Sequence, residues 1–73
     1  MTLKEFLTTA LAPDVKRPGQ RFSNMISHER WSIFEGLQAA GLDPYYRDDL
    51  LPAAISFTVE HWNDAQQEQV SDG

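Results

Sequence analysis

The sequence predicts a small all-α protein: a bundle of three to four short helices, with a proline-rich linker after the first helix and a disordered acidic C-terminal tail. Successive stretches carry apolar residues at the spacing of a helix face. Prolines and glycines fall between these stretches. A chain of 73 residues without cysteine has room for one small core and no disulfide. We therefore expect a single helical domain at 1–63 and a flexible tail at 64–73.

The first helix is expected to begin at Thr2 and to end near Leu11. Thr2 and Glu5 form the pattern of a capping box, in which each side chain bonds the backbone amide of the other residue. The apolar face consists of Leu3, Phe6, Leu7, Ala10 and Leu11. Pro13 cannot continue the helix, and residues 12–19 form a basic linker. Because this linker is long, we expect the first helix to dock loosely.

The second helix is expected to start near Pro18 or Gly19 and to end at a break near residues 28–30. Its apolar stripe consists of Phe22, Met25 and Ile26. Ser27 also fits the capping position of a helix that starts at His28.

The third helix is expected to run from this break through Ala40. Ser32 followed by Glu35 repeats the capping-box pattern. The residues predicted to face the core are Trp31, Phe34 and Leu37. Gly41 comes directly after this helix and suits a left-handed C-terminal cap.

Residues 43–52, DPYYRDDLLP, are expected to form a stiff elbow between the third and fourth helices. The Asp-Pro pair at its start is typical of a turn. Pro52 fits the first turn of a helix, where its missing amide proton has no cost. Asp48 and Asp49 precede that helix, where a negative charge interacts favourably with the helix dipole.

The fourth helix is expected over residues 51–62. Its apolar stripe consists of Leu51, Ile55, Val59 and Trp62. Apolar residues also alternate between Ile55 and Val59, which would fit a strand, but the chain offers no partner strand. Both tryptophans, Trp31 and Trp62, are predicted to lie in the core.

Charge and hydropathy argue against several classes of protein. The net charge is -5, and residues from Asp48 onward contain acids and no base, whereas a nucleic-acid binder needs a basic face. No apolar run approaches the roughly 20 residues of a membrane span. The N-terminal segment is too acidic and amphipathic for a signal peptide. We expect a cytoplasmic monomer that binds neither nucleic acid nor membrane.

The sequence shows no pattern typical of catalysis, a cofactor or a metal. A calcium loop needs alternating oxygen ligands and a central glycine, and residues 43–49 have prolines and tyrosines at those places. His28 and His61 have no second ligand at helical spacing. No serine lies in a glycine-flanked nucleophile motif, and no glycine-rich phosphate loop is present. We expect no enzyme activity, no metal site and no cofactor.

A surface that binds a partner is the remaining hypothesis. Tyr45 and Tyr46 are adjacent, so at most one ring points squarely inward and the other is an exposed aromatic of the kind that anchors interfaces. Basic side chains precede and begin the second helix; the alternative for them is a solvated helix N-terminus. The candidate contact residues are Arg17, Arg21, Tyr45, Tyr46 and Arg47.

The segment RPGQRFSN (17–24), the later segment GLDPYYRDDLLP (41–52) and a helix that ends in His-Trp occur together. This combination resembles a class of very short proteins carried by bacteriophages and prophages. That class has a G-Q-x-x-x-N start to its second helix, a D-P-aromatic-Tyr-x-D loop and a proline at its last helix. The match covers about residues 17–62. The matching residues are Gly19, Gln20, Asn24, Asp43, Pro44, Tyr45, Tyr46, Asp48 and Pro52.

Within that class, the length, the acidity and the added capped first helix resemble the small transcription regulator of a Xanthomonas bacteriophage. The resemblance implies a protein that binds the host RNA polymerase at the N-terminal segment of the β′ subunit. It also implies inhibition of initiation through weaker retention of the σ factor, together with antitermination. The resemblance assigns no contact residue.

An alternative hypothesis is an acidic mimic of nucleic acid that inhibits a host enzyme acting on DNA. Such a mimic needs carboxylates at phosphate-like spacing on its surface. The available acids are Asp48, Asp49, Glu60, Asp64, Glu68 and Asp72.

Overall fold

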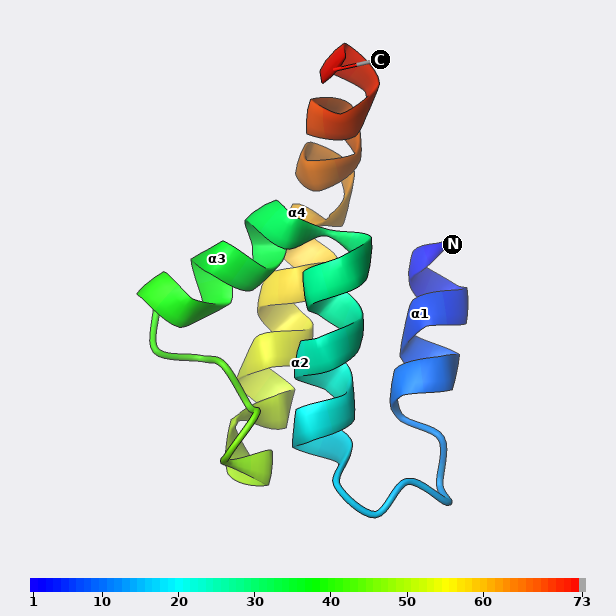
Figure 1. Cartoon of the computed structure of the whole chain (residues 1–73), viewed down its shortest axis with the longest axis vertical. Coiled ribbons are helices and arrows are strands. Elements are labelled where there is room, and N and C mark those ends of the chain that lie inside the picture. Colours follow the sequence, from blue (N-terminus) through cyan, green and yellow to red (C-terminus); the bar gives the residue numbers. More distant parts are fainter. Residues whose placement is uncertain (73) are drawn as a thin grey trace.

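The computed structural model describes the backbone of residues 1–72 and the side chains of residues 1–64. Four α-helices and one short 3₁₀ helix follow one another along the chain (Figure 1), and residues 1–72 contain no strand. The elements are α1 (Leu3–Ala10), α2 (Pro18–Glu29), α3 (Trp31–Ala39), η1 (Asp48–Leu50) and α4 (Leu51–Asp72). The predicted all-α class is confirmed.

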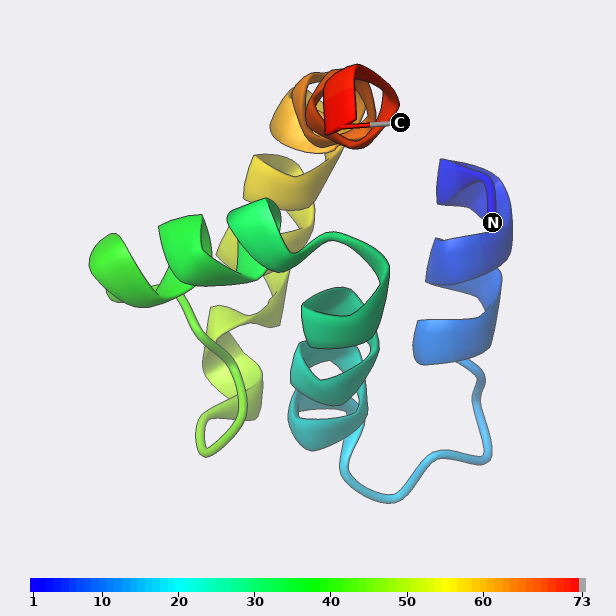
Figure 2. The same ribbon diagram turned by 45° about the horizontal axis from the view of Figure 1, so that its top comes forward.

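Helix α2 is the centre of the arrangement. It contacts α1, α3 and η1, and α3 in turn contacts α4. Figures 1 and 2 show α1 along one side of α2 and the loop that follows α3 on the other side. The fully or largely buried apolar core consists of Phe6, Ala10, Phe22, Ile26, Ile33, Leu37, Ala54 and Trp62.

Helix α1 begins with the predicted capping box. The Thr2 hydroxyl oxygen accepts from the Glu5 amide at 3.1 Å, and the Thr2 amide donates to the Glu5 carboxylate at 2.9 Å. Phe6 is fully buried, with its ring 5.3 Å from Phe22 and 5.4 Å from Trp62 between centroids. Helix α1 is therefore docked in the structure, and the looseness of that docking stays a prediction.

The junction between α2 and α3 is a single non-helical residue, Arg30, inside the predicted break. The second capping box is not formed, because α3 begins at Trp31 and Ser32 lies within the helix. The prediction that Trp31 faces the core is wrong, since 57% of it is exposed. The buried stripe of α3 is Ile33 and Leu37, and a residue two positions before Ile33 points to the opposite side of the helix.

The C-terminus of α3 has the predicted left-handed glycine. Gly41 has φ 72° and its amide donates to the Gln38 carbonyl at 3.2 Å. The Leu42 amide donates to the Leu37 carbonyl at 2.8 Å. These two bonds form a Schellman motif, which satisfies carbonyl groups that the helix end leaves free.

Helix α4 buries a stripe that partly matches the predicted one. Trp62 lies in the core as predicted, and Leu51 and Ile55 pack against the core. Ala54, Thr58 and Trp62 are buried, whereas Val59 is 48% exposed. The small side chain of Ala54 allows close packing, and the Thr58 hydroxyl donates to the Ala54 carbonyl at 2.8 Å, which satisfies its polar group. Pro52 lies in the first turn, as predicted.

Helix α4 continues to Asp72, ten residues beyond the expected end of the fourth helix at Trp62. Alanine, glutamine and glutamate in residues 65–69 have high helix propensity and extend a helix that is already nucleated. The side chains of 65–73 and the backbone of residue 73 lie outside the described part of the chain. The predicted flexibility there stays a prediction.

Candidate partner-binding surface

The loop of residues 43–48 is bonded to the first turns of α2. The Gly19 amide donates to Asp48 Oδ1 at 3.0 Å, and the Gln20 side-chain amide donates to the Tyr45 hydroxyl at 3.0 Å. A Cβ atom at Gly19 would collide with the Pro44 carbonyl oxygen. A glycine at this position is therefore required by the close approach of two backbones.

Asp48 lies in the first turn of η1, before α4 as predicted, but it also caps a second helix that the sequence did not indicate. The sequence places it before the fourth helix, but its carboxylate accepts from the free amide of Gly19 in the first turn of α2. Arg17, the residue at the capping position of α2, makes no side-chain cap. A carboxylate from a distant loop therefore supplies the acceptor and the negative charge that this helix N-terminus needs.

The loop is also rigid within itself. Asp43 Oδ1 accepts from the Ser23 hydroxyl at 2.7 Å and from the Tyr45 amide at 3.1 Å. The Arg47 amide donates to the carbonyl of Pro44, whose side chain is fully buried. These contacts form an Asx turn followed by a β-turn, and both are tied to α2 through Ser23.

The loop held in this way exposes one aromatic ring, that of Tyr46, to solvent. Tyr45 is half-buried and held by Gln20, whereas Tyr46 is 85% exposed. The two rings meet edge to face with 4.7 Å between their centroids. Tyr46 is the most exposed large apolar side chain among the described residues.

The five candidate contact residues do not form one surface. Tyr45, Tyr46 and Arg47 lie on the loop, whereas the Arg21 guanidinium donates to the Thr9 carbonyl at 3.1 Å and so contacts α1. Figures 1 and 2 place α1 and the loop on opposite sides of α2. Arg21 therefore stabilises the docking of α1, near the C-terminal end of that helix.

Arg47 and Arg17 are both exposed. The Arg47 guanidinium makes a two-pronged ion pair with Asp49, with N–O distances of 3.2 and 2.6 Å. The hydrogen bond with Asp49 raises the pKa of Arg47, and the same bond lowers the pKa of Asp49. Arg47 is thus engaged with its neighbour, although exposed ion pairs of this kind exchange readily with solvent.

Beside Tyr46 lies a cleft of about 250 Å³ between α2, α3 and the loop. Phe34 lines the α3 side of this cleft, and the exposed Trp31 packs on it with 5.1 Å between ring centroids. The sequence offers a signal for the cleft in two residue pairs at i, i+4 spacing. Ser23 and Ser27 line it from α2, and Phe34 and Gln38 line it from α3. The residues that line the cleft are Ser23, Asn24, Ser27, Phe34, Gln38, Asp43, Tyr45 and Tyr46.

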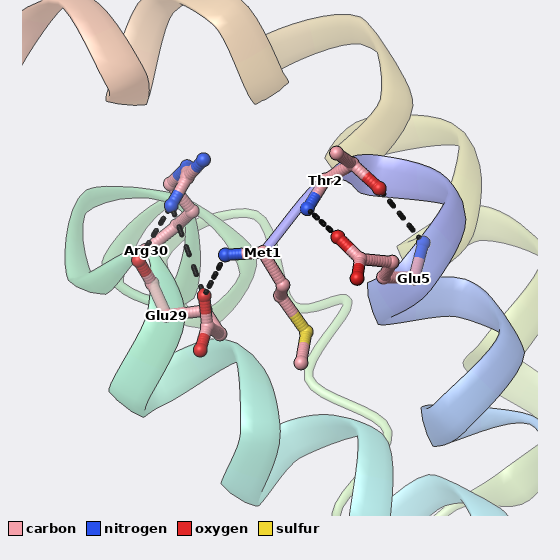
Figure 3. A network of polar contacts seen from close by, with 5 residues as sticks. All are labelled: Met1, Thr2, Glu5, Glu29 and Arg30. Carbon is pink, nitrogen blue, oxygen red and sulfur yellow. Dashed lines mark hydrogen bonds and ion pairs between the residues drawn. The ribbon is translucent and has the colours of Figure 1, made fainter.

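A second hollow of about 360 Å³ lies between the start of α1, the α2–α3 junction and α4. Arg30, which the sequence analysis did not single out, is 7% exposed there, with its guanidinium 4.1 Å above the Trp62 ring. Figure 3 shows Arg30 beside Glu29, whose carboxylate pairs with the Met1 amino group at 3.4 Å. The Arg30 Nε has no partner among the described residues. The stacking of Arg30 on Trp62 gives this region a packing role.

Among the described residues, no cluster of three or more histidine, cysteine or acidic side chains could hold a metal ion. In the same part of the chain, no helix combines the length and apolar character needed to cross a bilayer. Comparisons of the chain with protein-family models, curated proteins and solved structures find no match. The resemblance to phage-borne transcription regulators therefore stays a prediction that rests on the sequence motifs.

Proposed function

We propose that this protein is a protein-binding regulator that acts on a bacterial RNA polymerase in the cytoplasm of an infected cell. The observation that carries the proposal is Tyr46, an aromatic ring that is 85% exposed on a loop bonded to α2. A ring held in this way loses little conformational entropy on binding, which is why such residues act as anchors of interfaces. The proposed contact surface is the loop 43–47 with the neighbouring cleft.

The proposed partner is the N-terminal segment of the β′ subunit, which the resemblance implies. Binding there would inhibit initiation by weakening σ-factor retention, and the same complex would act in antitermination. A domain of this size offers up to about 800 Å² to one partner, which is enough for a specific contact with a short segment. Arg47 belongs to this surface, while Arg21 is assigned to the docking of α1.

The motif residues support a shared scaffold for such a surface. The bonds between α2 and the loop involve Gly19, Gln20, Asp43, Tyr45 and Asp48, with Asp43 bonded to Ser23. Their occurrence together in the sequence thus follows from the need to build this elbow. The side chains of Tyr46 and Asn24 are exposed and make no hydrogen bond among the described residues, so both are available for a partner.

The test is capture of purified RNA polymerase by the tagged chain. Tyr46→Ala is expected to weaken capture by about tenfold or more, because removal of an exposed anchor ring has effects of that size. Val59→Ala is the matched control, since Val59 is also exposed but lies on α4 by the second hollow. Both variants should retain the helical circular dichroism of the parent. Undiminished capture by Tyr46→Ala would show that the surface is wrong.

No described array of carboxylates favours the alternative of an acidic nucleic-acid mimic. Asp43 and Asp48 accept hydrogen bonds within the fold, and Asp49 is paired with Arg47. A chain truncated after Trp62 separates the two hypotheses. A mimic that depends on the acids of the C-terminal segment would lose its partner, whereas a regulator that acts through the loop would retain polymerase.

A further inference from the structure

The cleft beside Tyr46 contains one formally charged side chain, Asp43. Its other lining residues are serines, amides and aromatic rings, with no lysine or arginine among them. Asp43 Oδ1 already accepts two hydrogen bonds, from Ser23 and from the Tyr45 amide. Oδ2 accepts none from the described residues. The carboxylate therefore keeps one oxygen and its negative charge for a ligand.

Three aromatic rings line the same cleft, those of Phe34, Tyr45 and Tyr46. The face of an aromatic ring carries negative potential and attracts a cation placed over it. Aromatic rings beside a single carboxylate can recognise a cationic side chain, because the carboxylate and an exposed ring face both attract a positive charge. The charge of the cleft is thus complementary to a positive group.

We propose that this cleft binds an arginine side chain presented by an extended segment of the protein partner. The guanidinium donates to Asp43 Oδ2 and stacks on the ring of Tyr46 or Phe34. A volume of about 250 Å³ suits one long side chain, because pockets for whole small molecules are larger, at about 300–1,000 Å³. Arginine fits better than lysine, since its planar fork can both stack and bond a carboxylate.

Two amide side chains complete the site. Asn24 and Gln38 line the cleft from α2 and α3, and within the described residues neither side chain makes a hydrogen bond. Each amide can donate to a carbonyl and accept from an amide of the segment that carries the arginine. They would hold the backbone on both sides of the inserted side chain. This inference rests on the proposed function, because it names the chemistry of the partner at that same surface.

The first test uses the unaltered chain and needs no variant. The ¹⁵N-labelled protein is titrated with the blocked peptide acetyl-Gly-Ser-Arg-Ser-Gly-amide and followed by NMR. The control peptide has citrulline, which is neutral and nearly isosteric, in place of arginine. Shifts at the side-chain amides of Asn24 and Gln38 are expected with arginine, at an affinity at least about fivefold above that for citrulline, because the contact is charge-assisted. Equal affinities would overturn the proposal.

The second test uses two variants with the same change in net charge. Asp43→Asn keeps an oxygen at Oδ1 for Ser23 and Tyr45 and removes the charge. Asp64→Asn is the control, because Asp64 is exposed on α4 beside His61. Only Asp43→Asn should lower the affinity for the arginine peptide, again by at least about fivefold. Equal effects of the two variants would mean that the overall acidity of the chain, and not this cleft, attracts the peptide.

Polymerase capture distinguishes failure of this inference from failure of the proposed function. If Tyr46→Ala loses capture while Asp43→Asn keeps it, the loop is the contact surface and the arginine site is wrong. If both variants lose capture and Asp64→Asn does not, both proposals hold. If neither loses capture, both fail. Thermal unfolding of Asp43→Asn by circular dichroism, with a midpoint near that of the parent, ensures that the comparison is made between folded chains.

Discussion

The two sides of α2 are held by different kinds of contact. On one side, three hydrogen bonds run from α2 donors at Gly19, Gln20 and Ser23 to acceptors in the 43–48 loop. On the other side, α1 is held by burial of Phe6 against Phe22, with one hydrogen bond from Arg21. Directional bonds define where atoms lie, whereas apolar burial contributes most of the free energy.

This difference separates stability from recognition in a very small chain. The side of α2 that faces α1 contributes mainly to the free energy of unfolding. The side that faces the loop orients Tyr46 and Asp43, and it contributes less to the free energy of unfolding. Substitutions on the side that faces α1 should therefore change stability, and substitutions on the side that faces the loop should mainly change binding.

The largest loss of stability is expected from Phe6→Ala. Phe6 is fully buried between Phe22 and Trp62, so its removal should lower the free energy of unfolding by about 3–5 kcal/mol. Leu11→Ala is the control, because Leu11 is 36% exposed just after α1. Urea unfolding followed by circular dichroism measures both. A loss below about 1 kcal/mol for Phe6→Ala would show that the packing of α1 does not stabilise the fold.

Gly19→Ala should lower the free energy of unfolding by about 3 kcal/mol, since the new Cβ collides with the Pro44 carbonyl oxygen. Gly41→Ala, where φ is 72° and no atom lies within 4 Å, should cost about 1 kcal/mol. The contrast extends to binding. Gly19→Ala displaces the loop and should weaken polymerase capture, and Gly41→Ala should not. Equal capture by the two folded variants would contradict the assignment of the loop.

Asp48→Ala should lower the free energy of unfolding by about 1–2 kcal/mol, because the Gly19 amide loses its acceptor at the start of α2. Asp49→Ala is the matched control. It removes the adjacent acid and an exposed ion pair with Arg47, so no measurable change is expected. Thermal unfolding of both variants at one pH is the measurement. If Asp49→Ala proved the more damaging change, the capping role given to Asp48 would be wrong.

The smallest effect concerns the capping box of α1. The hydrogen bond from the Thr2 amide lowers the pKa of Glu5 below its ordinary value of 4.5. A lowered pKa means that the ionised form stabilises the fold above pH 4.5, and that this contribution is lost as the pH falls through the lowered value. The free energy of unfolding in urea should therefore be larger for the parent than for Glu5→Gln at pH 7. This difference between the two proteins should become smaller as the pH is lowered towards 3. A constant difference would exclude the charge of Glu5 as its source.

Local patterns of the sequence predicted much of this fold. The capping box at Thr2, the start of α2 at Pro18, the left-handed Gly41 and the position of Pro52 all depend on residues within a few positions of one another. Physical rules for such short spans apply whatever the rest of the chain does. The candidate loop was found for the same reason, because two prolines and adjacent tyrosines mark a stiff exposed turn.

Other features could not be predicted, because they depend on how helices rotate against one another. Trp31 was expected in the core, but packing of Ile33 and Leu37 turns it outward, so that 57% of it is exposed. Arg30 is buried because Trp62, distant in sequence, supplies a ring for it. An amphipathic pattern defines a broad apolar face, and only contact with neighbouring elements selects which part of that face is buried.

The sequence by itself thus determined the helical class, the breaks between helices and the stiff elbow, since each follows from bonds and steric limits within one or two turns of chain. Tertiary structure decided that Asp48 caps α2, that Arg21 belongs to the docking of α1, and that Asp43 faces a cleft lined by rings. These outcomes join residues 12 to 29 positions apart. Each bond forms only when packing of the apolar core brings the donor within about 3 Å of its acceptor.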